Sequence, residues 1–246
     1  MKKIITIILA FSGWYTAAST PQELFAKANE YYQQEQFADA AMLYDSIVNE
    51  GYVNAETFYN LANTHFRLGN LGNAILNYEK ALKLNPDDED AMHNLALANN
   101  QIVDEFNVVP TPVLKRIFAD VSSLFSSGIW SIIGVFFLGI MLVFVAVFLF
   151  GNRNSFILTL ALVSLILALI IEGFAYGKYQ LEQQSFGILT SPNSYVKSAP
   201  ANTSQDLYIL HEGTKVQIQD SFNSWSKIKL PDGKIGWIVS EDISEI

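Results

Sequence analysis

The sequence predicts a multidomain membrane protein of three structural parts: an all-α solenoid of helical repeats, a transmembrane helical hairpin, and a small all-β barrel. Three observations predict this fold class. Residue types recur at intervals of 34 in the first part of the chain, two apolar runs separated by five residues fill the middle, and hydrophobic and polar residues alternate near the end. A period of 34 is typical of helix-turn-helix repeats, and a period of two is typical of strands.

Charge is divided unevenly along the chain. Residues 19–107 carry four Lys and Arg against fourteen Asp and Glu, and residues 179–246 carry five against eight. Two acidic parts around an apolar centre are typical of soluble modules on a membrane anchor. The acidity argues against a nucleic-acid partner, because phosphates attract clustered Lys and Arg. The chain has no cysteine, which excludes disulfides, thiolate metal sites and a cysteine nucleophile.

Residues 1–18 have the pattern of a secretory signal peptide. Lys2 and Lys3 precede an apolar stretch, and small residues up to Ala18 suit cleavage at that point. An uncleaved anchor or a buried N-terminal helix is the alternative. A signal peptide would carry the next segment out of the cytoplasm.

Residues 21–107 contain the repeat, in which three alanines and two tyrosines recur at the interval of 34: Ala28, Ala62 and Ala96, and Tyr44 and Tyr78. The stretch AETFYNLANTHFRLGNLGNAILNYEKALKLNPDD resembles a tetratricopeptide repeat (TPR) over its whole length. Its small residues let paired helices approach, and its large residues fill the gap between repeats. About two and a half repeats are expected, with the final helix as the cap that such arrays need.

The resemblance to this family also predicts a binding surface. In the family, ligands lie in a concave groove lined by the first helix of each repeat. Seven residues map to that face, and they are our candidates for protein partners: Asn29, Tyr32, Tyr59, Asn63, Phe66, Arg67 and His93. The two asparagines could hold a peptide backbone by paired donor and acceptor. The acidic run 87–90 is interpreted as a helix start rather than a calcium loop, because acidic residues satisfy free N–H groups there.

An amphipathic linker helix is predicted for residues 111–127. Apolar residues recur there at four-residue spacing: Val113, Ile117, Val121 and Phe125. Two interpretations stay open. The helix lies at a membrane interface, or it packs on the first module.

Residues 129–150 and 156–174 are each long enough to cross a bilayer core, which needs about 20 helical residues. Between them, Gly151 tolerates the left-handed backbone that ends a helix, and Asn152 and Asn154 favour a turn. The break therefore predicts a hairpin. An even number of crossings puts both flanking modules on one side, which the signal peptide makes the extracytoplasmic side of a bacterial inner membrane.

Residues 186–246 alternate with a period of two, and Leu230-Pro-Asp-Gly-Lys234 is a hairpin signal. YVKSAP, LYILHEGTKVQI and WSKIKLPDGKIGWIVSEDI together resemble a bacterial SH3-like (SH3b) domain, which commonly binds peptide or cell-wall material. Trp237 shares its phase with Ile235 and Val239, which we expect to point inward. Trp225 is out of phase with Ile228 and Leu230, so it lies at a bulge or is exposed. The surface candidates for a ligand are Tyr195, Tyr208 and Trp225.

The order of these parts resembles the BatE-type proteins of the bacterial aerotolerance operon. That resemblance implies a membrane complex with the operon's von Willebrand A-domain proteins and a link to oxidative-stress tolerance. We expect a non-catalytic scaffold without cofactor or metal. A wall-associated enzyme is the alternative, although the sequence lacks G-x-S-x-G and H-E-x-x-H and its three His are scattered. A transmembrane sensor is a third hypothesis, which Glu172 in the second apolar run keeps open.

Overall fold

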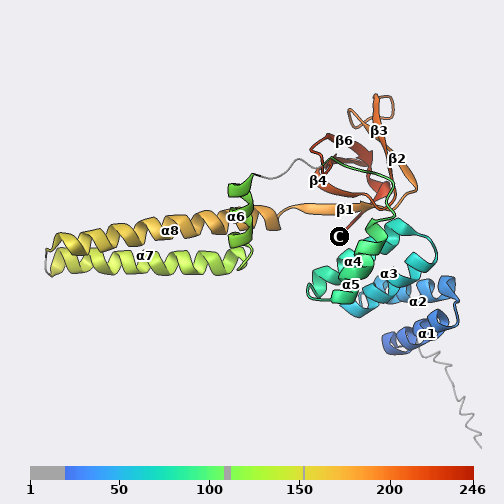
Figure 1. The fold of residues 1–246 in the computed structure, drawn as a ribbon, viewed down its shortest axis with the longest axis horizontal. Coiled ribbons are helices and arrows are strands. Elements are labelled where there is room, and N and C mark those ends of the chain that lie inside the picture. Colours follow the sequence, from blue (N-terminus) through green and yellow to red (C-terminus); the bar gives the residue numbers. More distant parts are fainter. Residues whose placement is uncertain (1–19, 108–111, 152) are drawn as a thin grey trace, which may run out of the picture. The chain divides into compact units, whose positions relative to one another are not determined.

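The computed structural model describes residues 20–107, 112–151 and 153–246. The predicted signal peptide, residues 1–18, lies outside the described residues. The chain divides into two compact units, one ending at Gln101 and the other running from Ile102 to Ile246. Figure 1 shows helices in the first unit, and a helical hairpin followed by a sheet in the second.

The first unit is a stack of antiparallel helix pairs, as the repeat predicts. Its helices are α1 (Pro21–Gln33), α2 (Phe37–Asn49), α3 (Ala55–Arg67), α4 (Leu71–Leu84) and α5 (Glu89–Asn99). Three of them begin at a side chain that accepts a backbone N–H: Thr20 before α1, Asn54 before α3 and Asp88 before α5. The Asp88 cap agrees with the interpretation of the acidic run as a helix start.

Alanines at the repeat positions allow the helices of a pair to approach closely. Ala28 on α1 and Ala62 on α3 are both 0% exposed, as are Ala40 on α2 and Ala74 on α4. Tyr44, which recurs as Tyr78, fills the space between the pairs and is 1% exposed. The array therefore has small residues within each pair and large ones between pairs.

The two apolar runs form an antiparallel hairpin, which confirms the prediction that the break turns the chain back (Figure 1). Helix α7 spans Ser127–Phe150 and helix α8 spans Ser155–Glu182. Both are long and apolar enough to cross a membrane, and few of their residues are buried. Helix α8 continues eight residues beyond the predicted end at 174, because Ala175, Lys178 and most of the residues after them favour a helix.

The turn between these helices differs in detail from the expectation. Gly151 has φ of −120°, so its backbone is not left-handed. A Cβ at this position would lie 2.8 Å from the Val147 carbonyl oxygen, and this close approach is what requires glycine. Asn154 then caps α8 by accepting the Phe156 N–H at 2.9 Å.

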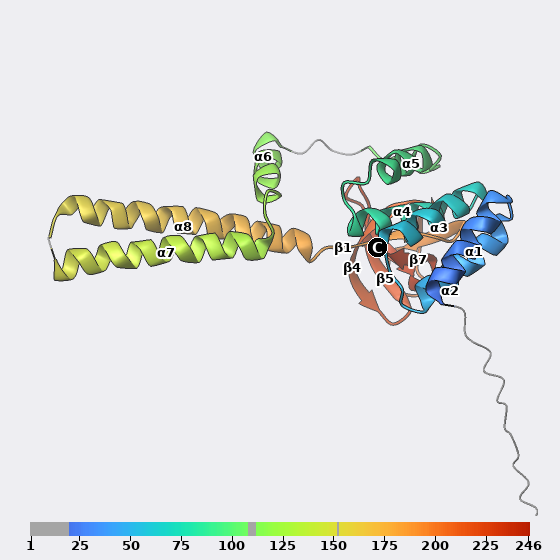
Figure 2. The ribbon, with the colours of Figure 1, turned by 90° about the horizontal axis from the view of Figure 1, so that it is seen from below.

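The linker helix α6 (Val113–Ser122) packs on the hairpin, at the end away from the turn (Figure 2). The Phe118 ring stacks on Phe174 of α8 with centroids 4.8 Å apart, and Phe174 stacks in turn on Trp130. The Trp130 Nε1–H donates to the Ser122 carbonyl oxygen at 3.1 Å. An aromatic cluster thus joins α6, α7 and α8.

The last part is one antiparallel sheet of seven strands, in the order β3-β2-β6-β5-β4-β1-β7. The strands are β1 (Ser185–Leu189), β2 (Asn193–Lys197), β3 (Asp206–His211), β4 (Lys215–Phe222), β5 (Trp225–Lys229), β6 (Ile235–Val239) and β7 (Ile243–Glu245). Buried side chains from six strands meet in one cluster: Leu189, Val196, Leu210, Val216, Ile228 and Ile238, joined by Leu230. Because one core serves six strands, the sheet has to curve around it.

The orientation predicted for strand β6 is wrong. On β6, Ile238 is 0% exposed whereas Ile235 is 46% exposed, so the inward phase is the opposite of the one predicted and Trp237 is only half-buried. The buried residue at position 236 is glycine. A Cβ there would lie 2.3 Å from the Val196 side chain, so only glycine fits at this position. A buried glycine has no hydrophobic side chain to reveal the phase.

Candidate interaction surfaces

A ladder of asparagine and tyrosine side chains crosses the first helices of the repeats. Asn29 on α1 accepts from the Tyr44 hydroxyl and from Asn60 on α3. One period later, Asn63 accepts from the Tyr78 hydroxyl at 2.6 Å and from Asn94 on α5 at 3.0 Å, so the same unit recurs. Each unit joins a helix pair to the next first helix. Asn60 and Asn94 were not among the predicted residues, although their spacing of 34 could have revealed them.

Burial keeps the two ladder tyrosines neutral. It raises the pKa of Tyr44 and of Tyr78 well above the usual value of 10.0, and neighbouring tyrosines push in the same direction. Both hydroxyls therefore remain hydrogen-bond donors at any physiological pH. The carbonyl oxygens of Asn29 and Asn63 are thus already used within the array, which limits the paired peptide contact predicted for them.

The other groove candidates lie where they were mapped, on the first helices α1, α3 and α5. Tyr59 is half-buried, with its hydroxyl accepting from Asn94 at 3.2 Å. The Arg67 guanidinium lies over the Phe37 ring at 4.5 Å, and that ring meets Tyr32 edge-on at 5.3 Å. Phe66 is half-buried and His93 is exposed. Arg67 and His93 are therefore the groove candidates most accessible to a partner.

The third repeat leaves its pairing face open. Ala28 and Ala62 are covered by α2 and α4, but the equivalent Ala96 on α5 is exposed. Met92 and Leu97 on the same helix are each 45% exposed. Among the described residues, no second helix buries this position of α5 as α2 and α4 do in the earlier repeats.

The surface candidates of the sheet divide into one exposed and two covered residues. Tyr195 is 53% exposed. Tyr208 is half-buried, and its hydroxyl has no partner among the described residues. Burial, together with nearby Asp232, raises the pKa of Tyr208. Trp225 is 7% exposed and belongs to the interior, so placing it on the surface was wrong. Burial does not alternate at the start of β5, where Trp225 and Ser226 are both buried.

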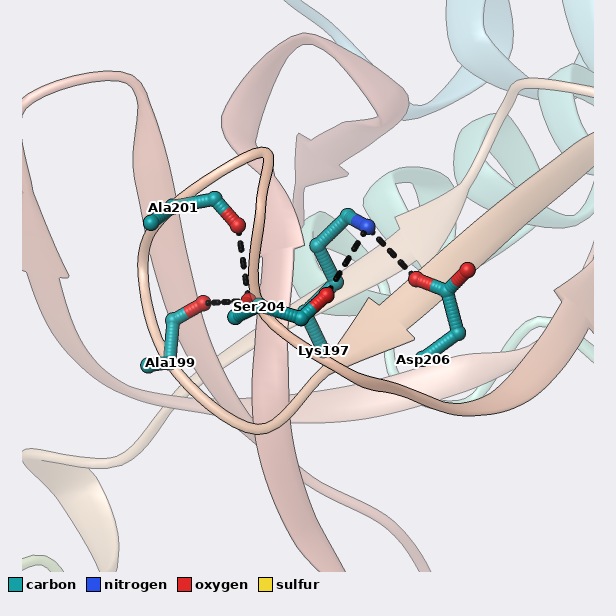
Figure 3. A network of polar contacts seen from close by, with 5 residues as sticks. All are labelled: Lys197, Ala199, Ala201, Ser204 and Asp206. Carbon is teal, nitrogen blue, oxygen red and sulfur yellow. Dashed lines mark hydrogen bonds and ion pairs between the residues drawn. The ribbon is translucent and has the colours of Figure 1, made fainter.

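The loop after Tyr195 is held by polar contacts (Figure 3). The Ser204 hydroxyl lies 2.7 Å from the carbonyl oxygens of both Ala199 and Ala201. The Lys197 ammonium contacts the Asp206 carboxylate at 2.5 Å, at the ends of β2 and β3. These bonds hold the loop between β2 and β3 in place.

One cluster of polar contacts was not predicted at all. Asp104, which precedes the hairpin in the sequence, contacts His211 and Thr214 at the turn between β3 and β4. Phe106 packs against the core of the sheet. The segment 102–107 was assigned to the repeat domain, but it belongs to the second unit. No local sequence signal marks such a contact, because its partners are more than one hundred residues apart.

Comparison with known families agrees with the division of the chain. A tetratricopeptide repeat model matches residues 55–88, and a bacterial SH3 domain model matches residues 192–244. The chain thus combines a tetratricopeptide array and a bacterial SH3 domain with two apolar helices between them. Both classes suggest binding of proteins or of cell-wall material. No curated protein shows significant similarity to the chain. The likeness to BatE-type proteins stays a prediction.

Proposed function

We propose that the protein is a non-catalytic, membrane-anchored adaptor whose repeat array and SH3 domain bind partners on the extracytoplasmic side. The observation that supports this most is the contact of Asp104 with His211, because these residues precede and follow the hairpin. A contact within one chain across two membrane crossings requires both ends on the same side. Two linked binding modules gain avidity from their high effective concentration.

The groove of the array is the proposed site for protein partners. The described groove residues offer aromatic rings, amides and a cation, a set that suits peptide recognition rather than catalysis: Tyr32, Tyr59, Asn63, Arg67 and His93. Membrane proteins with von Willebrand A domains, in a complex for oxidative-stress tolerance, are the partners that the family resemblance implies. The SH3 domain would add a peptide or cell-wall ligand near Tyr195.

The test is a pull-down of the tagged full-length chain from solubilised membranes after crosslinking in intact cells. The variant Arg67→Glu with His93→Ala changes exposed groove residues and leaves the ladder in place. Met42→Ala, on the second helix α2 and 68% exposed, is the matched control. We expect the groove variant to lose membrane partners that the control retains. Equal recovery would contradict the proposal, as would cleavage of a wall or peptide substrate by the purified chain.

A sensor acting through its spans is a second candidate function. Glu172 on α8 faces Gly134 on α7, where any Cβ would overlap the carboxylate. Beside it is a cavity of about 290 Å³ lined by small and polar residues: Ser127, Gly128, Ser131, Ala175, Tyr176 and Tyr179. An ionisable residue within an apolar, membrane-spanning helix is by default a hypothesis for a functional site. Glu172→Gln should abolish signalling in a sensor and leave partner recovery unchanged in an adaptor.

A further inference from the structure

Residues 102–107, which follow the last repeat helix, lie on the SH3 domain as an extended peptide. From 102 to 107 burial alternates with every residue: Ile102, Asp104 and Phe106 are half-buried, and the residues between them are exposed. Successive side chains of an extended chain point to opposite faces. Asp104 and Phe106 therefore share the face that meets the domain, whereas Glu105 points away.

The Asp104 carboxylate is bound by three groups of the domain. One oxygen accepts from the His211 backbone N–H at 2.7 Å and from the Thr214 hydroxyl at 2.6 Å. The other oxygen lies 2.7 Å from the His211 Nδ1. The Asp104 side chain is only 11% exposed. Burial opposes its charge, but these bonds hold its pKa below the usual value.

The receiving turn is built independently of the segment that it binds. The Gly213 N–H donates to the Leu189 carbonyl oxygen at 2.8 Å, and the Leu189 N–H donates to the Thr214 carbonyl oxygen at 3.0 Å. These bonds hold the turn against β1. Thr214 is 1% exposed, so without Asp104 its hydroxyl would lose a partner in a buried place. The turn therefore presents fixed donors to a carboxylate.

We propose that the β3–β4 turn and the adjacent core edge form a binding site for an extended peptide with a carboxylate followed two residues later by an aromatic ring, and that Asp104 and Phe106 fill this site in cis. The inference deepens the proposed function and rests on it in one respect, because occupancy in cis requires both ends on one side of the membrane. An outside ligand of the same chemistry would have to displace residues 102–107.

The first test uses hydrogen exchange of the purified full-length chain in detergent, where membrane sidedness has no influence. In Asp104→Ala, exchange across residues 207–214 should rise about ten- to a hundredfold, as expected when a hydrogen-bonded charge is removed. The neighbouring Glu105→Ala removes the same charge from the exposed face and should leave exchange unchanged. Unchanged exchange in Asp104→Ala would overturn the proposal.

The second test separates a peptide site from a purely structural contact. A synthetic peptide of residues 101–107, QIVDEFN, is added to the chain carrying Asp104→Ala with Phe106→Ala. We expect the peptide to restore protection at 207–214, and the same peptide with Asn in place of Asp to fail. No restoration by either peptide would refute the site, even if the pull-down succeeds. Failure of the pull-down with restoration here would refute only the adaptor function.

Discussion

Because Ala96 is exposed, we predict that replacing alanine by leucine destabilises the fold at position 62 but has little effect at position 96, one repeat later. Ala62 is 0% exposed between α3 and α4, and Leu would add three carbons where the helices already touch. Overpacking of this kind costs about 1–3 kcal/mol. Ala96 is exposed, so Leu there should change the free energy of unfolding by less than about 0.5 kcal/mol.

Hydrogen exchange of the full-length chain measures both effects locally, in peptides from α3, α4 and α5. Each 1.4 kcal/mol of lost stability corresponds to about a tenfold increase in the open population, so Ala62→Leu should accelerate exchange by about 5- to 150-fold. Ala96→Leu should give less than about a threefold change. Ala28→Leu should resemble Ala62→Leu, since Ala28 is also 0% exposed.

Equal acceleration by Ala62→Leu and Ala96→Leu would refute the reasoning. It would mean that another helix covers α5 in solution. The third repeat would then be closed like the first two, and its open face would not exist.

Three further predictions concern other parts of the chain. Gly177→Ala should release α6 from the hairpin and raise its exchange rate, because a Cβ at 177 would lie 2.5 Å from the Phe118 ring; Gly173→Ala, with nothing within 4 Å, is the control. Asn54→Ala should cost the first unit about 1 kcal/mol through loss of the α3 cap, and Asn54→Asp should not, as pulse proteolysis in urea would show. Burial lowers the pKa of His65 from its usual 6.5, so the folded state binds fewer protons than the unfolded state, and the stability of the first unit should fall as pH drops below that value. The variant His65→Phe should flatten this loss, and a wild-type urea midpoint that stays constant between about pH 7.5 and 5.5 would contradict it.

Periodic features of the fold could be predicted from the sequence. The interval of 34 located the helix pairs, and two long apolar runs with a polar break located the hairpin. These signals are local or repetitive, so one chain reveals them. The Leu230–Lys234 turn was equally visible, and it is closed by a bond from the Leu230 N–H to the Lys234 carbonyl oxygen at 2.9 Å.

Features set by tertiary contact could not be predicted. The phase of β6 depends on Gly236 fitting beneath Val196, and glycine carries no hydrophobic signal. Trp225 was placed on the surface because it is out of phase with Ile228, but burial does not alternate at the start of β5, where Trp225 and Ser226 are both buried. The docking of Asp104 joins residues 107 positions apart, and no pattern in either segment indicates the other.

The length of α8 has a mechanical consequence. Its 28 residues extend about 42 Å at 1.5 Å per residue, whereas a bilayer core is about 30 Å thick. If α8 begins at one surface of the bilayer core, about 12 Å of the helix extends beyond the opposite surface. Only Gln183 and Gln184 separate the end of α8 from β1, and two residues span about 7 Å at most. A link this short would keep the SH3 domain within a few ångströms of the end of α8, and therefore near the membrane surface.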